Sequence, residues 1–389
     1  MVVCAAVLAG CTAANAHAPN WSAQANSTLE PGAGPGVVAQ PQGTAPSTAV
    51  PGPTASGATP SPSASAAADP EVVATGLSAP TGLVVLPDGT ALVGERTTGR
   101  LLIVQPTAGK PTKVVRTLSG LDATGGGGLL DLALSPSYDE DGLIYAYITT
   151  ATDNRVIDFT LTGPATPVFT GIPKGATDNQ GRLLFNAQNN LLIGTGDAGN
   201  SALAADRSSL AGKVLEVTDT GQPVGSSAVF TLGHHTVGGL CLDSANGAVL
   251  ETEPRSGYTS DEVNVLTAGA NYGWPGGPPG STQAAAVLPA AIGGIGDCAV
   301  LQGNLYVTSL DDKSLLSATL TAANPPKPGS FSENLKATYG RLLTVVAAPD
   351  NSLWLTTSNK DGHGSPVSAD ERVLHIPPPV PASGGTSNA

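Results

Sequence analysis

A turn-and-strand motif recurs six times between residues 86 and 355, and its spacing constrains the fold more than any other feature of the sequence. Each copy joins a turn rich in Pro, Asp, Asn or Gly to a short apolar run, as in LPDGTALV at 86–93 and DNSLWL at 350–355. The turn markers of the six copies are Gly89, Gly142, Asn190, Gly247, Gly303 and Asn351. Their steps of 53, 48, 57, 56 and 48 residues match the length of a four-stranded propeller blade. The spacing predicts an all-β fold, a six-bladed β-propeller with four-stranded antiparallel blades.

The sequence also predicts the type of turn that joins the strands within a blade, and the strand that closes the ring. Gly and Asn are typical of two-residue hairpin turns, which require positive φ angles. We expect the strand at residues 71–75 to complete the last blade beside residues 372–376. A two-sheet sandwich is the alternative fold, but six evenly spaced copies favour the propeller.

The charge of the chain excludes some partners. Its 389 residues include 17 Lys and Arg against 30 Asp and Glu, which gives a net charge of −13. A nucleic-acid surface needs clustered basic residues, and the sequence has no such cluster, so we expect no nucleic-acid partner. No apolar run reaches the roughly 18 residues that a membrane-spanning helix needs.

The N-terminus predicts export and lipidation. Residues 1–10 form the apolar stretch of a lipoprotein signal peptide, and the segment Leu8-Ala9-Gly10 before Cys11 has the form of a lipobox. A lipid on the Cys11 thiol would anchor the protein to the outer face of the cell membrane, in the cell envelope. No Lys or Arg precedes the apolar stretch, although export signals carry one, so we expect the true translation start to lie upstream.

Composition divides the rest of the chain. Residues 11–70 are rich in Ala, Pro, Ser, Thr and Gly, which predicts a disordered tether that holds too little apolar surface to offset its ordering entropy. The propeller is expected at 71–377, followed by a disordered tail at 378–389.

The propeller contains two cysteines, Cys241 and Cys298, and we expect a disulfide between them because exported domains tend to pair their cysteines. A metal role for them is the weaker alternative, since two thiols alone cannot complete a zinc site.

Several segments resemble one family in sequence order. GLSAPTGLVVLPDGTALVGER at 76–96, GTGDAG at 194–199, and DEVN at 261–264 running into GANYGWP at 269–275 are similar to the soluble PQQ-dependent glucose/sorbosone dehydrogenases. The resemblance covers nearly all of residues 71–377 and implies the same six-bladed propeller. It also implies a cofactor site for PQQ and a bound calcium ion, so each site position needs to be compared with the family pattern.

The catalytic position of the family is changed in this sequence. In the family, a histidine accepts the proton of the sugar hydroxyl while hydride passes to PQQ. The matching residue is Asp178 in the segment DNQGRL. An aspartate, with a reference pKa of about 4, is a weak base at neutral pH unless burial raises that value.

The cofactor-binding positions are changed as well. An Arg-Asn pair that holds the cofactor in the family matches His235 and Thr236, and a lysine matches Asp311. Of two family arginines, Arg341 remains and Leu343 replaces the other. PQQ carries three carboxylates, and three lost contacts of roughly 1.5–3 kcal/mol each would weaken binding by about 10³–10⁶-fold. The resemblance therefore implies a degenerate site that binds PQQ weakly.

Calcium ligands are better preserved. The family binds calcium through backbone carbonyls at a position that matches Glu253 and Pro254, and Glu262 matches an acidic position near a structural calcium. Oxygen ligands of this kind suit calcium, although the alternative is that the acids are solvated residues at strand ends.

His234 and His235 are neighbours and would face opposite sides of a strand, so we do not expect them to share a metal. We expect Trp274 and Trp354 in the blade core.

Three functional hypotheses follow. The leading one is an envelope lipoprotein whose propeller has lost its catalytic apparatus and acts as a binding or scaffold module, a monomer that recognises an envelope protein or a carbohydrate. The second is an active PQQ- and calcium-dependent sugar dehydrogenase with Asp178 as base and with His235 and Arg341 holding the cofactor. The third is a calcium-dependent lactonase, which would need Glu, Asn and Asp side chains converging on the central channel.

Overall fold

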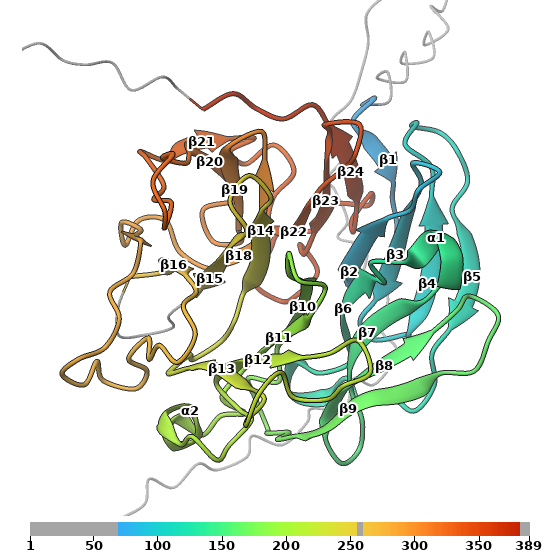
Figure 1. Ribbon diagram of the computed structural model, residues 1–389. Coiled ribbons are helices and arrows are strands. Elements are labelled where there is room, and N and C mark those ends of the chain that lie inside the picture. Colours follow the sequence, from blue (N-terminus) through green and yellow to red (C-terminus); the bar gives the residue numbers. More distant parts are fainter. Residues whose placement is uncertain (1–68, 255–259, 382–389) are drawn as a thin grey trace, which may run out of the picture. The chain divides into compact units, whose positions relative to one another are not determined.

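The computed structural model describes residues 69–254 and 260–381, and within them six four-stranded antiparallel sheets form the blades of a β-propeller (Figure 1). The expected signal peptide at 1–10, the lipidation residue Cys11 and nearly all of the tether lie outside the described residues. Blades one to three consist of β2 (Pro80–Val85), β3 (Ala91–Glu95), β4 (Arg100–Val104), β5 (Lys113–Thr117); β6 (Leu129–Leu134), β7 (Ile144–Thr149), β8 (Asn154–Phe159), β9 (Thr166–Ile172); and β10 (Gly181–Phe185), β11 (Leu191–Thr195), β12 (Lys213–Val217), β13 (Val229–Leu232).

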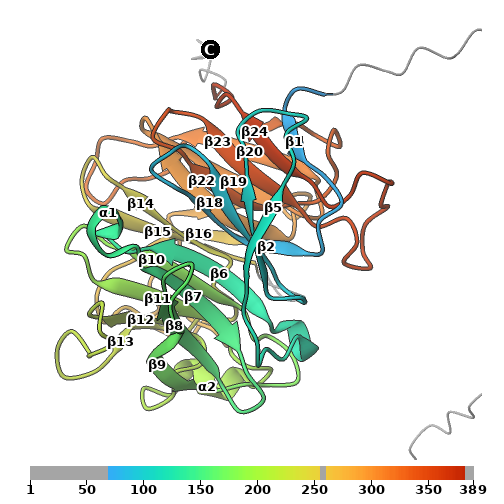
Figure 2. The same ribbon diagram turned by 90° about the vertical axis from the view of Figure 1, so that its right-hand side faces the viewer.

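The remaining three blades complete the ring. They consist of β14 (Gly239–Asp243), β15 (Ala248–Glu253), β16 (Glu262–Val265), β17 (Ala286–Val287); β18 (Ile295–Leu301), β19 (Asn304–Ser309), β20 (Ser314–Thr319), β21 (Ser332–Asn334); and β22 (Leu342–Ala347), β23 (Leu353–Thr357), β24 (Val373–Ile376) with β1 (Val72–Ala74). The innermost strands β2, β6, β10, β14, β18 and β22 each contact the next, and β22 contacts β2, so the ring is closed. Figure 2 views the molecule from the side on which β2 to β5 lie.

Closure uses the N-terminal strand, as the sequence predicts. β1 pairs antiparallel with β24, with Val72 opposite Leu374 and Ala74 opposite Val373. The first and last strands of the propeller therefore share one sheet, which ties the two ends of the domain together. Shortly after β24, the backbone carbonyl of Pro379, in the expected tail, accepts a hydrogen bond from the Tyr306 hydroxyl at 3.0 Å.

The turn markers are correct at five positions and displaced at one. Gly89, Gly142, Gly247, Gly303 and Asn351 all have positive φ. In blade three the positive φ of 61° belongs to Asn189 instead of Asn190. The reason is local: the Asn186 side chain accepts hydrogen bonds from the backbone of Gln188 and Asn190, and this turn shifts the left-handed residue by one.

The turns are also longer than expected in most blades. Gln302 and Gly303 form the expected two-residue turn between the paired residues Leu301 and Asn304. In contrast, Gly142 follows the short helix α1 (Tyr138–Asp141) as its left-handed cap. The other helices of the described residues are equally short, α2 (Ser201–Ala205) and the 3-10 turn η1 (Thr124–Gly126). None of the described helices is long and apolar enough to cross a membrane.

Apolar side chains between neighbouring blades form the core. Phe159, Leu101 and Ile144 belong to one such cluster between blades one and two, and all are at most 1% exposed. Between blades two and three, a Cβ on Gly181 would lie 2.2 Å from the Tyr147 ring, so close approach of the blades requires glycine there. Trp354 is buried in the core as predicted and stacks on His375 with ring centroids 4.6 Å apart.

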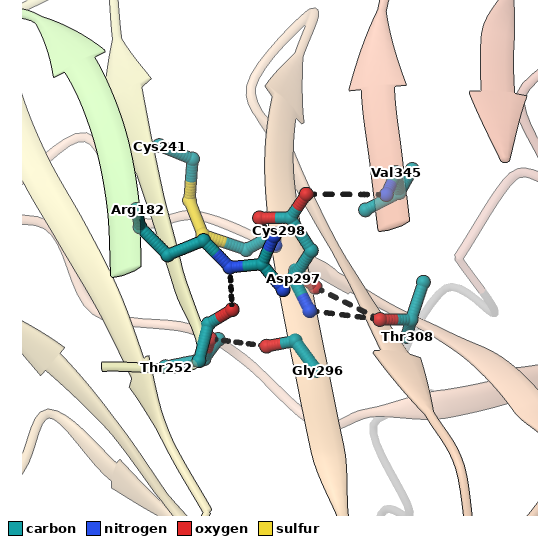
Figure 3. The surroundings of a disulfide bond; sticks show 9 residues. Arg182, Cys241, Thr252, Gly296, Asp297, Cys298, Thr308 and Val345 are labelled. Atoms are coloured by element: carbon teal, nitrogen blue, oxygen red, sulfur yellow. Dashed lines mark hydrogen bonds between the residues drawn. A yellow bond between two sulfur atoms is a disulfide. The ribbon is translucent and has the colours of Figure 1, made fainter. Parts of the chain in front are cut away.

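A disulfide links two innermost strands. Cys241 of β14 and Cys298 of β18 are bonded, which confirms the predicted pairing, and both side chains lie in the core between blades four and five (Figure 3). The bond joins two strands that are 57 residues apart in sequence. It therefore holds adjacent blades together at the centre of the ring.

Candidate functional site

A pocket of about 300 Å³ opens at the N-terminal ends of the innermost strands. Each blade contributes to its wall, through Thr81, Leu130, Arg182, Gly238, Gly296 and Leu343. A preformed pocket on the axis of a ring, built from the ends of several strands, is the usual location of a ligand site. This pocket is therefore the candidate functional site.

Two of the cations that line the pocket, Arg96 and Lys360, donate to backbone carbonyl oxygens. Arg96 Nη1 donates to the carbonyl oxygen of Gly127 at 3.0 Å, and Lys360 Nζ donates to the carbonyl oxygen of Asp370. Asp361 also lines the pocket and adds negative charge. The wall thus combines engaged cations with an acid.

Arg341 lies beside this wall in a double ion pair. Its Nε donates to Asp361 Oδ2 and its Nη1 to Asp311 Oδ1, each at 2.8 Å. The Arg341 side chain is 8% exposed, so both carboxylates act on a charge that is nearly removed from water. Leu343 places an apolar side chain in the pocket wall two residues further on. Arg341 is therefore held by acidic neighbours and is not a free cation.

Asp178 and His235 come together next to the pocket. Asp178 lies in the loop before β10 with a φ of 53°, and its Oδ1 is 4.0 Å from His235 Nε2. His235 lies between β13 and β14, and its ring packs on Trp274 with centroids 4.6 Å apart. Gln180 and Thr236, close to these residues in sequence, line the pocket itself. The structure thus joins the expected base position and one expected cofactor position.

Two members of this group were missed or misplaced by sequence reasoning. Asp197 lies with Asp178 and His235, so that one potential ligand atom from each falls within 4.8 Å of the others. Its motif GTGDAG carries part of the family resemblance but indicates no role for the carboxylate. Trp274 was expected in the blade core; instead it is half-buried and donates from Nε1 to Asp197 Oδ2 at 2.9 Å. The sequence does hint at this position, because Trp274 directly precedes the Pro- and Gly-rich segment at 275–280, which is typical of a loop and not of a strand in a blade core.

The predicted calcium residues lie at the end of blade four. Glu253 ends β15 and faces Glu262 of β16 in register. Glu253 is fully buried, with Oε2 3.2 Å from His234 Nδ1 and Oε1 accepting from the backbone N–H of His235 at 2.8 Å. The Pro254 carbonyl lies 3.4 Å from His235 Nδ1. His234 and His235 thus belong to different groups, while a calcium ion at Glu253, Pro254 and Glu262 stays a prediction.

Comparison with known proteins places this geometry in a family. The profile of the glucose/sorbosone dehydrogenases matches residues 77–284, which is 208 of the 389 residues. The chain belongs to the glucose/sorbosone dehydrogenase family.

Relatives of known structure and sequence agree with this placement. The PQQ-bound aldose sugar dehydrogenase of Streptomyces coelicolor is 34% identical, with a TM-score of 0.73 over 79% of this chain and 96% of that one. The aldose sugar dehydrogenase YliI of Escherichia coli is 26% identical over 75% of this chain and 90% of its own length. Quinoprotein glucose dehydrogenase B of Acinetobacter calcoaceticus is 28% identical over 53% of this chain. The chain spans only 52% of the length of that last relative.

The site residues differ from what PQQ, the cofactor expected for a glucose/sorbosone dehydrogenase, would need. A tricarboxylate needs cations whose hydrogen-bond donors are free to turn toward it. Among the described residues, Arg341 is neutralised by Asp311 and Asp361, and Arg96 and Lys360 donate to carbonyl oxygens. Arg182 also lines the pocket, where its Nη1 forms no hydrogen bond, but its charge is balanced by the buried carboxylates of Asp131 and Asp297. The carboxylate of Asp311, 63% exposed, would repel a bound carboxylate. The described side chains therefore do not fit PQQ.

Proposed function

We propose that this family member is an exported, lipid-anchored propeller with a degenerate cofactor site and a binding or scaffold role in the cell envelope. The observation that carries the proposal is the double ion pair of Arg341 with Asp311 and Asp361. Two carboxylates already balance the charge of this arginine, so it attracts a cofactor carboxylate less than an arginine without acidic partners does. The remaining pocket, open on the axis and lined by all six blades, suits a carbohydrate or a loop of an envelope protein.

The anchoring part of the proposal rests on sequence. Cys11 after Leu8-Ala9-Gly10 would carry the lipid, and residues 11–70 would separate the propeller from the membrane. The order of lipobox, tether and propeller is similar to that of the mycobacterial lipoprotein LppZ. Metabolic labelling with a radioactive fatty acid tests this part, because labelling should be lost in Cys11→Ala and kept in Cys4→Ala. Equal labelling of both variants would refute the anchor at Cys11.

Weak or absent PQQ binding is the first expected result. In a calorimetric titration of the full chain with PQQ in calcium buffer, we expect a dissociation constant weaker than about 100 μM, since three charge-assisted contacts are lost. The Streptomyces coelicolor enzyme, titrated in the same buffer, is the positive control. Micromolar binding, or PQQ-dependent dye reduction with aldoses, would overturn the proposal.

Restoring the family residues provides a sharper version of this test. Asp311→Lys combined with Leu343→Arg replaces one repulsive and one apolar group with two cations, and should tighten PQQ binding by about 10²–10⁴-fold. The matched control, Asp139→Lys with Val114→Arg, makes the same charge change at exposed positions away from the pocket. An equal gain in both variants would mean that net charge alone governs binding, and the ion-pair argument would fail.

Each alternative function makes its own demand on the structure. An active enzyme with Asp178 as base predicts that Asp178→Asn abolishes turnover. A calcium lactonase needs acidic ligands on the axis of the propeller. Asp131 and Asp297 do line the central channel, the cavity between the innermost strands. Both accept backbone hydrogen bonds, from Leu183 and Cys298, and both interact with Arg182. A cation beside Arg182 would be repelled, so the geometry does not favour the lactonase.

A further inference from the structure

Three potential metal ligands meet at the edge of blade three, outside the wall of the pocket. Asp178 precedes β10, Asp197 follows β11, and His235 lies between β13 and β14. One ligand atom from each lies within 4.8 Å of the other two. The backbone fixes the three loops to one another, because the Asp197 N–H donates to the His235 carbonyl and the Ala198 N–H to the Asp178 carbonyl. The cluster is therefore held by main-chain bonds as well as by side chains.

The cluster carries two negative charges without a matching cation. In the described part of the chain, neither Asp178 nor Asp197 forms an ion pair with Lys or Arg, and Asp197 is only 2% exposed. Among residues 69–254 and 260–381, His235 is the basic group at the cluster, and its Nε2 lies 4.0 Å from Asp178 Oδ1, which is too long for a hydrogen bond. Asp178 is partly exposed and Asp197 is buried, and a cation between the two carboxylates would offset their mutual repulsion.

The surroundings of His235 orient its Nε2 lone pair toward the carboxylates. Its Nδ1 lies 3.4 Å from the Pro254 carbonyl oxygen, which can only accept, so in a neutral His235 this contact favours the tautomer with the hydrogen on Nδ1. In that tautomer Nε2 is an acceptor that faces another acceptor, Asp178 Oδ1. Histidine ligands of metals show this pattern, with one ring nitrogen donating to a backbone carbonyl and the other binding the ion.

Asp197 is also positioned by neighbours that leave it able to bind an ion. Its Oδ2 accepts from Trp274 Nε1 at 2.9 Å and its Oδ1 from the Gly199 N–H at 2.8 Å. Each carboxylate oxygen has two lone pairs, so one on each oxygen remains available. The same Trp274 ring packs on His235, which fixes both ligands through one side chain.

A second feature points to a ligand beside the cluster. Thr236 follows His235, is 5% exposed, and its hydroxyl oxygen has no hydrogen-bond partner among the described residues. The side-chain oxygen of Gln180, two residues after Asp178, is buried and equally without a partner there. Both residues line the pocket. Buried polar atoms without partners are costly, and a bound ligand with water or hydroxyl groups would satisfy them.

We propose that Asp178, Asp197 and His235 bind a divalent zinc-type metal ion at the position where the family carries its catalytic base. One imidazole nitrogen with two carboxylates favours zinc and similar transition metals over calcium, which prefers oxygen ligands alone. Three protein ligands leave coordination positions for an oxygen-containing ligand of the ion. Thr236 and Gln180, which line the pocket and lie one and two residues after His235 and Asp178, would hydrogen-bond to that ligand. The substitution of the family histidine by Asp178 thus supplies a metal ligand, and the site is independent of PQQ.

The test is a zinc titration of the full chain, produced without an affinity tag and freed of metal by a chelator. Calorimetry should show one zinc ion per chain at micromolar or tighter affinity, with a tenfold excess of calcium unable to compete. His235→Gln and Asp178→Asn should each weaken binding by more than about 100-fold, and Trp274→Phe by about 10-fold, because loss of a partner of a ligand costs less than loss of the ligand. His363→Gln and Asp139→Asn, at exposed positions, are the matched controls and should bind as wild type.

Cobalt gives a readout that does not depend on heat. Co²⁺ bound to the cluster should show visible absorption bands that disappear in His235→Gln while the far-ultraviolet circular dichroism stays unchanged. Zinc binding weaker than about 100 μM, or undiminished binding in both ligand variants, would overturn the proposal. Because PQQ takes no part in this titration, its outcome is separate from that of the cofactor test above.

Discussion

Replacing Arg182 with methionine is expected to lower the free energy of unfolding at about pH 8 by about 3–5 kcal/mol, because it leaves two buried carboxylates without their cation. Arg182 of β10 donates from Nε to the Gly238 carbonyl at 2.5 Å, and its Nη1 lies 3.9 Å from Asp131 Oδ1. Its guanidinium also lies beside Asp297 of β18 (Figure 3). Three blades thus contribute one charge each to the centre of the channel.

The pH dependence of this loss has a definite sign. Burial raises the pKa of Asp131 to about 7 and that of Asp297 to about 6, while Arg182 acts in the opposite direction. A carboxyl whose folded pKa is raised favours folding while protonated, and that contribution is lost as pH rises through 6 to 7. Removing Arg182 raises both pKa values further. The loss in Arg182→Met should therefore be smaller at about pH 5 than at about pH 8.

Urea unfolding at both pH values measures the effect. Arg155→Met, which breaks the more exposed ion pair with Asp153, is the control and should cost less than about 1 kcal/mol. Adding Asp131→Asn and Asp297→Asn to Arg182→Met should recover most of the stability, because no buried charge then remains. An equal loss at both pH values, with no recovery in the triple variant, would show that packing and not charge accounts for the role of Arg182.

Removing the disulfide should have the second large effect. The double variant Cys241→Ala, Cys298→Ala is expected to lose about 2–4 kcal/mol of unfolding free energy, because the bond closes a loop across a separation of 57 residues. Both sulfur atoms are also in the core, so some packing is lost with them. Urea unfolding in non-reducing buffer measures the difference between the variant and the wild type.

Reductant provides the control for this prediction. Dithiothreitol should destabilise the wild type to about the level of the double variant and leave the variant unchanged. If reductant has no effect on the wild type and the variant loses less than about 1 kcal/mol, the two thiols are not bonded in the protein.

The repeat in the sequence is sufficient to predict the architecture. Hairpins and blade spacing are local properties, so the markers from Gly89 to Asn351 indicate six blades, and the positions of the first and last strands indicate the closing pair of β1 with β24. The error at Asn190 also has a local cause, the turn around Asn186. The pairing of Cys241 with Cys298 follows from their number in an exported domain.

The site could be predicted only in part. The family resemblance located Asp178, His235 and Arg341, and the structure shows that the first two meet. Sequence reasoning treated Arg341 as an available cation, since nothing near it in the chain reveals its pairing with Asp311 and Asp361. Trp274 was assigned to the core because its large apolar ring suits burial; its bond to Asp197 depends on a loop 77 residues away in sequence.

The sequence by itself determined the elements that repeat along the chain: strands, turns, blade number and the disulfide. Tertiary structure alone decided which charges meet, because ring closure brings together residues from different blades. Arg182, Asp131 and Asp297 come from three blades. Asp178 and His235 lie in loops that join blade three to its two neighbours, and Asp197 lies in a loop within blade three. Electrostatic energy depends on distance in space and on burial, and neither can be read from positions along the chain.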